Sequence, residues 1–115
     1  MPRSEKQPES GNALSHVAFL NDLVGYQEGS VTSRTLIDRN TGTVTLFAFD
    51  KDQGLSEHTA PFDALVHVLD GAVKITIAGE GSQLKAGQAI IMPANIPHAV
   101  KALTRFKMML VMVRS

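Results

Sequence analysis

The sequence has no cysteine and no tryptophan, and its 115 residues include only one tyrosine and five phenylalanines. Without cysteine, disulfide bonds, thiolate metal sites and cysteine nucleophiles are excluded. No apolar run approaches the roughly 18 residues that span a bilayer, and the first ten residues are polar. Neither a membrane helix nor a signal peptide is therefore expected, which predicts a cytoplasmic location.

An excess of charge of one sign is also missing, because eleven basic residues balance eleven acidic ones. The basic residues do not cluster, so the positive surface typical of nucleic-acid-binding proteins is not expected. With 43% hydrophobic and 19% charged residues, the composition is that of one globular domain. A small-molecule partner is therefore predicted, without nucleic acid or membrane.

The N-terminal part of the chain divides into two predicted segments. Residues 1–14 are polar, contain two prolines and are expected to be flexible. Residues 15–30 form a lead-in segment in which Ser15 stands at the N-cap position of a short helix and Gly25 ends it. A short extended segment is the alternative. The apolar residues that would share one helical face are Val17, Leu20 and Val24.

From residue 31 to residue 115 the hydrophobic period changes to two, which is typical of β-strands. Residues 43–49 and 72–78 both alternate in this way, and turns rich in glycine, asparagine and aspartate separate the runs. Helices between the strands, which a parallel sheet would need, are not indicated. The pattern predicts an all-β fold, an antiparallel sandwich or closed barrel.

The last predicted strand, residues 105–113, is apolar on both of its faces. An outer strand of a monomer would show one polar face. This strand is therefore either enclosed between other elements or covered by a second subunit. The second possibility predicts a homodimer.

Three histidines, His58, His67 and His98, are candidate metal ligands, because neutral imidazole is the commonest transition-metal ligand in proteins. If His58 points into a barrel, strand alternation directs His67 the other way. His67 is therefore the weaker candidate, unless a bulge near Pro61 shifts the register. The same alternation predicts a pocket lining, to which methionine adds a soft apolar surface. The predicted pocket-lining residues are Ala60, Phe62, Ala64, Val66 and Met92.

Gly87, Pro93, Asn95 and His98 follow one another at a spacing that resembles the second motif of the cupin family, G(X)5PXG(X)2H(X)3N. Asn95 stands where the motif has its second glycine, and Ala102 stands at the closing asparagine. Asparagine is the residue that most readily adopts the left-handed conformation of glycine.

The first cupin motif, G(X)5HXH(X)3-4E(X)6G, is kept in part. His58 and Gly71 are in register with it, whereas Asp52 stands at the opening glycine. Ala60 and Ala64 replace the second histidine and the glutamate. The resemblance covers residues 31–113 and implies a small single-domain cupin, an antiparallel jelly-roll β-barrel also called a double-stranded β-helix.

The resemblance also implies a divalent transition metal (Zn, Fe, Mn or Ni) and dioxygenase or isomerase chemistry, with His58 and His98 as ligands. Two neutral imidazoles leave the charge of such an ion uncompensated, so a metal at low occupancy, or none, stays open. Three hypotheses follow. The barrel binds a metal and a small molecule in its interior pocket, or it is a metal-free or weakly metallated sensing dimer, or the histidine pair performs metal-independent acid/base isomerisation.

Overall fold

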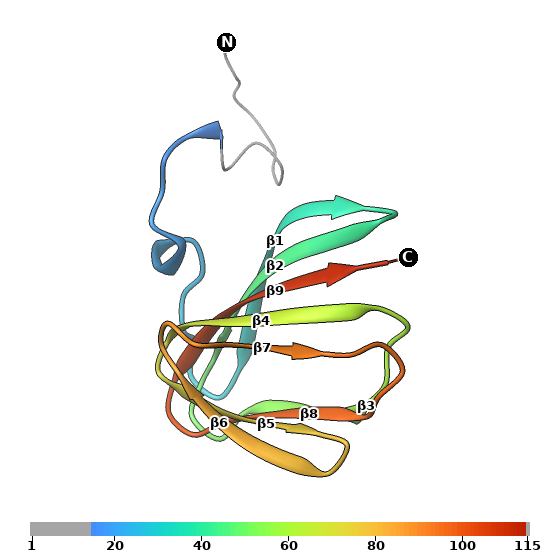
Figure 1. The fold of residues 1–115 in the computed structure, drawn as a ribbon. Coiled ribbons are helices and arrows are strands. Elements are labelled where there is room, and N and C mark those ends of the chain that lie inside the picture. Colours follow the sequence, from blue (N-terminus) through green and yellow to red (C-terminus); the bar gives the residue numbers. More distant parts are fainter. Residues whose placement is uncertain (1–14, 115) are drawn as a thin grey trace.

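The computed structural model describes residues 15–114, so the segment 1–14 that was expected to be flexible lies outside the described residues (Figure 1). The described chain begins with a short lead-in that contains a 3-10 turn, η2 (Leu20–Asp22), and then forms a series of strands. These are β1 (Val31–Arg39), β2 (Gly42–Phe49), β3 (Gly54–His58), β4 (Asp63–Asp70), β5 (Ala72–Ile77), β6 (Glu80–Lys85), β7 (Ala89–Met92), β8 (His98–Ala102) and β9 (Phe106–Val113).

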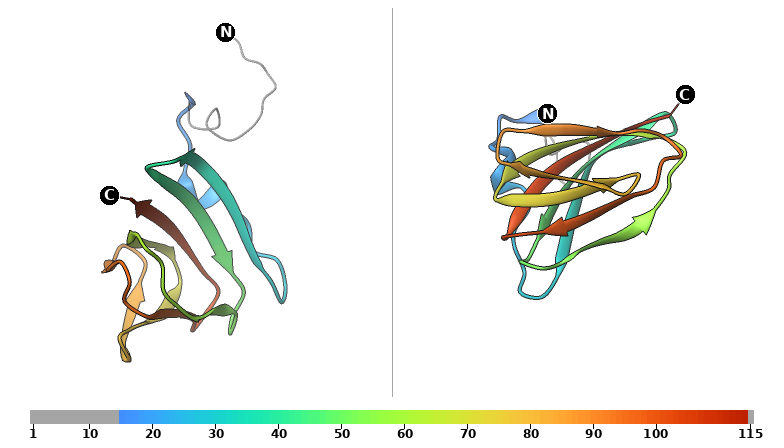
Figure 2. Two further views of the ribbon diagram at one scale, coloured as in Figure 1. Left: turned by 90° about the vertical axis from the view of Figure 1, so that its right-hand side faces the viewer. Right: turned by 60° about the horizontal axis from the view of Figure 1, so that its bottom comes forward.

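The strands form two curved sheets that face each other (Figures 1 and 2). One sheet has the order β1-β2-β9-β4-β7 and the other has the order β3-β8-β5-β6. Every strand pair is antiparallel. The predicted all-β antiparallel jelly-roll barrel is confirmed. None of the helical segments within 15–114 has the length and apolar character that crossing a bilayer requires.

Strand alternation sorts the apolar side chains into two cores. In β2, Phe47 and Phe49 contact the core between the two sheets, whereas Leu46 and Ala48 belong to a second core on the outer face of the five-stranded sheet. In β5, the buried residue Val73 precedes exposed Lys74, so this strand has one face in the interior and one in solvent. The two-residue period therefore decides which face of its sheet each side chain lies on.

β9 lies between β2 and β4 in the middle of the five-stranded sheet. Its inner face places Phe106 and Met108 in the barrel core, and its outer face places Met109 in the second core. This position explains why the strand is apolar on both sides, and for these residues a second subunit is not required.

The helix expected near the start of the chain is reduced to η2. Val17 is fully exposed, whereas Val24 is buried, so the two do not share one packed face. Phe19, which precedes η2, has an extended backbone and makes no side-chain cap. The reason is tertiary packing. The segment crosses the outer face of the sheet and packs several apolar side chains there, which a compact helix would not allow. These side chains are Leu20, Leu23, Val24 and Tyr26.

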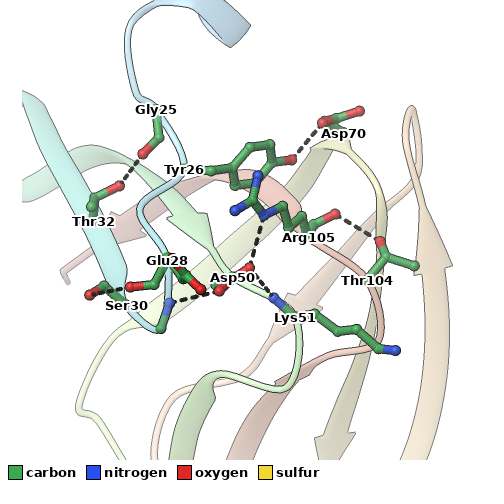
Figure 3. A network of polar contacts seen from close by, with 11 residues as sticks. Gly25, Tyr26, Glu28, Ser30, Thr32, Asp50, Lys51, Asp70, Thr104 and Arg105 are labelled. Carbon is green, nitrogen blue, oxygen red and sulfur yellow. Dashed lines mark hydrogen bonds and ion pairs between the residues drawn. The ribbon is translucent and has the colours of Figure 1, made fainter.

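A polar network fixes the segment after η2 to the loops at this end of the barrel (Figure 3). The Tyr26 hydroxyl donates to Asp70 Oδ2 at 2.5 Å, and the guanidinium of Arg105 and the ammonium of Lys107 lie 5.3 and 5.0 Å from the Tyr26 ring centroid. Burial raises the pKa of the Tyr26 hydroxyl above its usual value, and the hydrogen bond and negative charge of Asp70 raise it further. Tyr26 therefore stays neutral and acts as a hydrogen-bond donor.

Asp50 is the acceptor at the centre of this network. It accepts hydrogen bonds from the backbone N–H of Gly29 at 2.7 Å, from Arg105 Nε at 2.8 Å and from the N–H of Lys51 at 2.9 Å. The Gly29 bond first, then the Arg105 and Lys51 bonds, lower the pKa of Asp50 to about 2.

Asp50→Asn is expected to lower the midpoint of urea unfolding at pH 7, because the carboxylate and its charge-assisted bonds are lost. Since the folded pKa lies below the unfolded value, the contribution of Asp50 is complete above about pH 5 and declines as the pH falls from about 4 toward 2. The difference in unfolding midpoint between the wild type and the variant should therefore become smaller as the pH is lowered from 5 to 3. A difference that stays constant over this range would show that the network does not depend on the ionised carboxylate.

Candidate functional site: a histidine pair in the barrel

The end of the barrel opposite the N-terminal segment brings two histidines together. His58 ends β3 and His98 begins β8, and the two residues are paired in register. Leu55 pairs with Val100, so a regular ladder would place residue 57 opposite His98. An irregularity between Leu55 and His58 adds one residue to β3 and turns His58 toward His98. This bulge assembles the pair.

The two imidazoles face each other through the same ring atom. His98 Nε2 lies 3.2 Å from His58 Nε2, and the rings meet edge to face with centroids 4.4 Å apart. The other nitrogen of each ring contacts a backbone carbonyl two residues earlier in the chain. His58 Nδ1 lies 2.7 Å from the oxygen of Ser56, and His98 Nδ1 lies 3.1 Å from the oxygen of Ile96.

These contacts determine where the protons lie. A carbonyl oxygen only accepts, so each Nδ1 must carry a hydrogen and donate it. In a neutral imidazole the remaining nitrogen, Nε2, then presents a lone pair. Two neutral rings would thus direct two lone pairs at each other across 3.2 Å, which is repulsive unless a cation or a hydrogen-bond donor lies between or beside them.

The two rings differ in their access to solvent. The side chain of His98 is buried, with 6% of its surface exposed, whereas His58 is exposed. A ligand reaching the pair from solvent would therefore meet His58 first, with His98 forming the inner wall. Polar surface at such a mouth, backed by an apolar interior, is the usual construction of a small-molecule site.

The predicted pocket-lining residues fall into two groups. Ala64, Val66 and Met92 are buried and belong to the core between the sheets. Ala60 and Phe62 are half-buried and lie in the loop between β3 and β4. The first group therefore packs in the core, and the second lies in the loop that follows His58.

His67 does not join the pair. It lies in β4 between buried Val66 and Val68, so its side chain points to the opposite, outer face of the sheet, where it is paired in register with Met109 and Ala89. Among residues 15–114, no group of three or more His, Cys, Asp or Glu side chains lies close enough to hold a metal ion.

The loop before His98 is tied to the loop after His58. Asn95 has a φ of 65°, the left-handed conformation for which asparagine is the best substitute for glycine. Its backbone N–H donates to the oxygen of Ala60 at 2.8 Å, and the N–H of Ala94 donates to Asp63 Oδ1 at 2.9 Å. These bonds hold the two motif segments side by side at the rim.

Two features of the rim carried little signal in the sequence. The carbonyls that orient the histidines belong to the backbone, and the only hint was Pro97, which favours an extended conformation at Ile96. The second feature is Arg114, whose guanidinium lies 4.6 Å from the ring centroid of Phe62 and so places a positive charge near the rim. Nothing in the spacing of the sequence indicated that these two residues meet.

The histidine pair fits two of the ligands of a metal ion. Metal-bound histidines usually donate their second ring N–H to a carbonyl or carboxylate, which fixes the tautomer and the ring orientation. Both histidines do this here. A tetrahedral ion with nitrogens about 2.0–2.1 Å away would separate them by about 3.3–3.4 Å, close to the 3.2 Å observed. Ala60 and Ala64 provide no donor atoms, so further ligands would have to be water or a bound molecule.

Comparison with known proteins agrees with the geometry. Residues 45–114 match a family model described as a cupin domain. A conserved protein of unknown function from Streptococcus pyogenes is 38% identical, with a TM-score of 0.87 over 96% of this chain and 98% of that chain. A cupin 2 conserved barrel domain protein from Leptotrichia buccalis is 41% identical, with a TM-score of 0.80 over 82% of this chain and 46% of that chain.

A third solved structure, a cupin superfamily protein from Desulfitobacterium hafniense, is 24% identical and has a TM-score of 0.84, covering 99% of this chain and all of the other. At that identity the likeness concerns the fold alone. No curated protein matches the sequence.

Proposed function

This chain belongs to the cupin family, and we propose that its barrel binds a divalent transition metal ion through His58 and His98, together with a small molecule that completes the coordination shell. One observation carries the proposal: both Nε2 atoms converge at 3.2 Å while both Nδ1 atoms are held by backbone carbonyls. Imidazole ligands favour Zn, Fe, Ni or Cu over the hard cations Mg and Ca.

The residues around the histidine pair have different roles in binding. The carbonyls of Ser56 and Ile96 fix the tautomer and orientation of each ring, so neither imidazole has to lose ring rotation when it binds. His98 is buried and gives the inner ligand, whereas exposed His58 allows exchange with solvent. When bound, the ion would act as a Lewis acid toward an oxygen of the bound molecule.

The lack of metal-ligating atoms at Ala60 and Ala64 favours an anionic small molecule. Because Ala60 and Ala64 provide no carboxylate or imidazole, the protein would contribute two neutral ligands and leave the charge of the ion uncompensated. A carboxylate on the bound molecule would neutralise that charge. Small carboxylate-bearing compounds are therefore the proposed ligand class.

Removing either histidine is expected to weaken metal binding more than the about 10- to 100-fold caused by losing an outer partner of a ligand. The measurement is calorimetric titration of Zn²⁺ or Ni²⁺ into untagged protein that has been stripped with a chelator. The variants are His58→Ala and His98→Ala, and the matched control is His67→Ala, which changes the same residue type on the outer face. The control should bind as the wild type does.

Three results would count against this proposal. Equal affinity in the wild type and both site variants would mean that the ion binds elsewhere. A loss of affinity in His67→Ala as large as in the site variants would also mean that the ion does not bind specifically at the histidine pair. If the wild type binds neither ion, the two lone pairs must be satisfied by a hydrogen-bond donor, as the metal-free binding hypothesis requires. Binding should also weaken as the pH falls, because protons compete for the imidazole nitrogens.

A further inference from the structure

Two methionines flank Ala64 on the inner face of the five-stranded sheet. Ala64 is paired in register with Met92 of β7 and with Met112 of β9. Residues directly opposite each other on antiparallel strands point to the same face. Ala64 and Met92 belong to the core between the sheets, and Met112 packs against it. The position at which the cupin motif has its glutamate is therefore flanked by two thioether side chains, Met92 and Met112, which we call the methionine pair.

The methionine pair lies at the same end of the barrel as the histidine pair. A short loop leads from His58, which ends β3, to the start of β4, where Ala64 lies. A second loop leads from Met92, which ends β7, to His98, which begins β8. The two loops lie side by side where they connect the sheets, and a backbone hydrogen bond joins them (Figure 1). The two pairs are thus placed on facing sheets at one end of the interior.

A hydroxyl group without a partner lies in the same row as the methionine pair. Thr43 of β2 is paired in register with Met112, and strand alternation gives it the inward face of Phe47 and Phe49. Its Oγ1 atom is buried and has no hydrogen-bond partner among residues 15–114. Buried hydroxyl groups are almost always satisfied by protein, water or a ligand. A further polar group is therefore expected beside the methionine pair.

The donor atoms at this end of the barrel are soft and uncharged. The chain has no cysteine, so methionine is its only source of a sulfur ligand. Thioether sulfur and imidazole nitrogen both suit Cu(I). Neither the methionine pair nor the histidine pair supplies a negative charge, and the desolvation cost of an ion rises with the square of its charge. This set of donors therefore favours a soft monovalent ion over a divalent one.

We propose that the histidine pair and the methionine pair together bind one Cu(I) ion, through both imidazole Nε2 atoms and both thioether sulfurs. This inference rests on the proposed metal site and names a second ion for it. A divalent ion there requires an anionic small molecule to balance its charge, whereas Cu(I) finds its remaining ligands in the chain itself. Methionine is unbranched and flexible, so each thioether can turn from core packing toward the ion.

The first test measures the affinity of the full chain for Cu(I) by competition with bicinchoninate, a chromophoric Cu(I) chelator, under anaerobic reducing conditions. The double variant Met92→Leu, Met112→Leu keeps side-chain volume but removes both sulfurs. It should raise the dissociation constant for Cu(I) by at least about 30-fold. The dissociation constant for Ni²⁺, which binds through the imidazoles, should change by less than about threefold.

The matched control removes two other sulfurs from the same strand. Met108 lies in the barrel core and Met109 packs in the second core on the outer face. Neither is paired in register with Ala64. The double variant Met108→Leu, Met109→Leu should therefore bind Cu(I) as the wild type does.

X-ray absorption at the copper edge identifies the ligands of the Cu(I)-loaded protein directly. The wild type and the control variant should show a sulfur shell in addition to a nitrogen shell. The double variant Met92→Leu, Met112→Leu should keep the nitrogen shell and lose the sulfur shell.

The contrary results separate this inference from the proposed metal site. Equal Cu(I) affinity in the wild type and the methionine double variant, with Ni²⁺ still bound, would overturn the inference and leave the metal site standing. A wild type that binds neither Ni²⁺ nor Cu(I) would overturn both. If the double variant also loses Ni²⁺, the spectrum of the wild type decides, because a shell of nitrogen alone overturns the inference. A control variant that loses as much Cu(I) affinity as the site variant would overturn it too.

Discussion

Replacing Gly71 with alanine is expected to lower the free energy of unfolding by about 2 to 5 kcal/mol. Gly71 has a φ of 76°, in the left-handed region that costs an alanine about 1 to 2 kcal/mol. A Cβ atom at this position would also lie 1.9 Å from the carbonyl oxygen of Arg105, which is backbone and cannot turn aside. Moving packed neighbours to relieve such a collision costs about 1 to 3 kcal/mol more.

The control for this prediction is Gly79→Ala. Gly79 has a similar φ of 83°, but nothing lies within 4 Å of the position its Cβ would take. Gly79→Ala should therefore lower the free energy of unfolding only by the backbone cost of about 1 to 2 kcal/mol. Urea unfolding followed by circular dichroism measures both variants. Equal losses would show that the approach of Arg105 to the β4–β5 turn contributes nothing to stability.

The Gly71 contact matters because it joins the turn after β4 to the loop before β9. The N–H of Ala72 donates to the Thr104 hydroxyl at 3.0 Å, and the N–H of Leu103 donates to the oxygen of Ala72 at 3.1 Å. Arg105, whose carbonyl approaches Gly71, holds Asp50 through its side chain. A shift of this loop would therefore disturb the polar network that anchors the N-terminal segment.

Replacing Phe106 with alanine is expected to cost about 3 to 5 kcal/mol, the usual result of emptying a buried phenylalanine site. Phe106 is fully buried, and its ring stacks on Phe49 with centroids 4.6 Å apart and planes inclined by 17°. The two rings come from adjacent strands, β9 and β2, and are paired in register. Losing one leaves a cavity between the sheets and removes the aromatic contact as well.

Phe106→Leu separates the two contributions. Leucine keeps much of the side-chain volume but not the ring. Phe106→Leu should therefore lower the free energy of unfolding by less than about 2 kcal/mol. The same urea unfolding measurement applies to both variants. If alanine costs no more than leucine, the core must collapse into the space that the ring leaves, and the stacked pair would not be the rigid centre that its geometry indicates.

Much of the barrel could be predicted because its signals are local. Alternation of apolar and polar residues assigns a face to each side chain without knowledge of the neighbouring strand. Residues 43–49 and 72–78 therefore appeared as strands, and their inward side chains are those of the barrel core. The conformation of Asn95 was also predictable, because turn geometry limits which residues tolerate a positive φ.

The site could be predicted only in part, because its geometry depends on long-range pairing. His58 and His98 were identifiable from their spacing to Gly71 and Gly87, and the structure brings them together. A one-residue bulge in β3 decides that His58 faces His98, and strand pairing determines such a bulge. The carbonyls that fix both tautomers are backbone groups, which no residue pattern identifies.

The sequence by itself determined the barrel and identified the pair of histidines, because strand period, turn residues and motif spacing are properties of short segments. Only the tertiary structure decided the course of residues 15–26, where an expected helix gave way to packing across the sheet. It also decided the register that pairs His58 with His98. Both depend on contacts between distant segments, whose energies outweigh the weak local preferences of the chain.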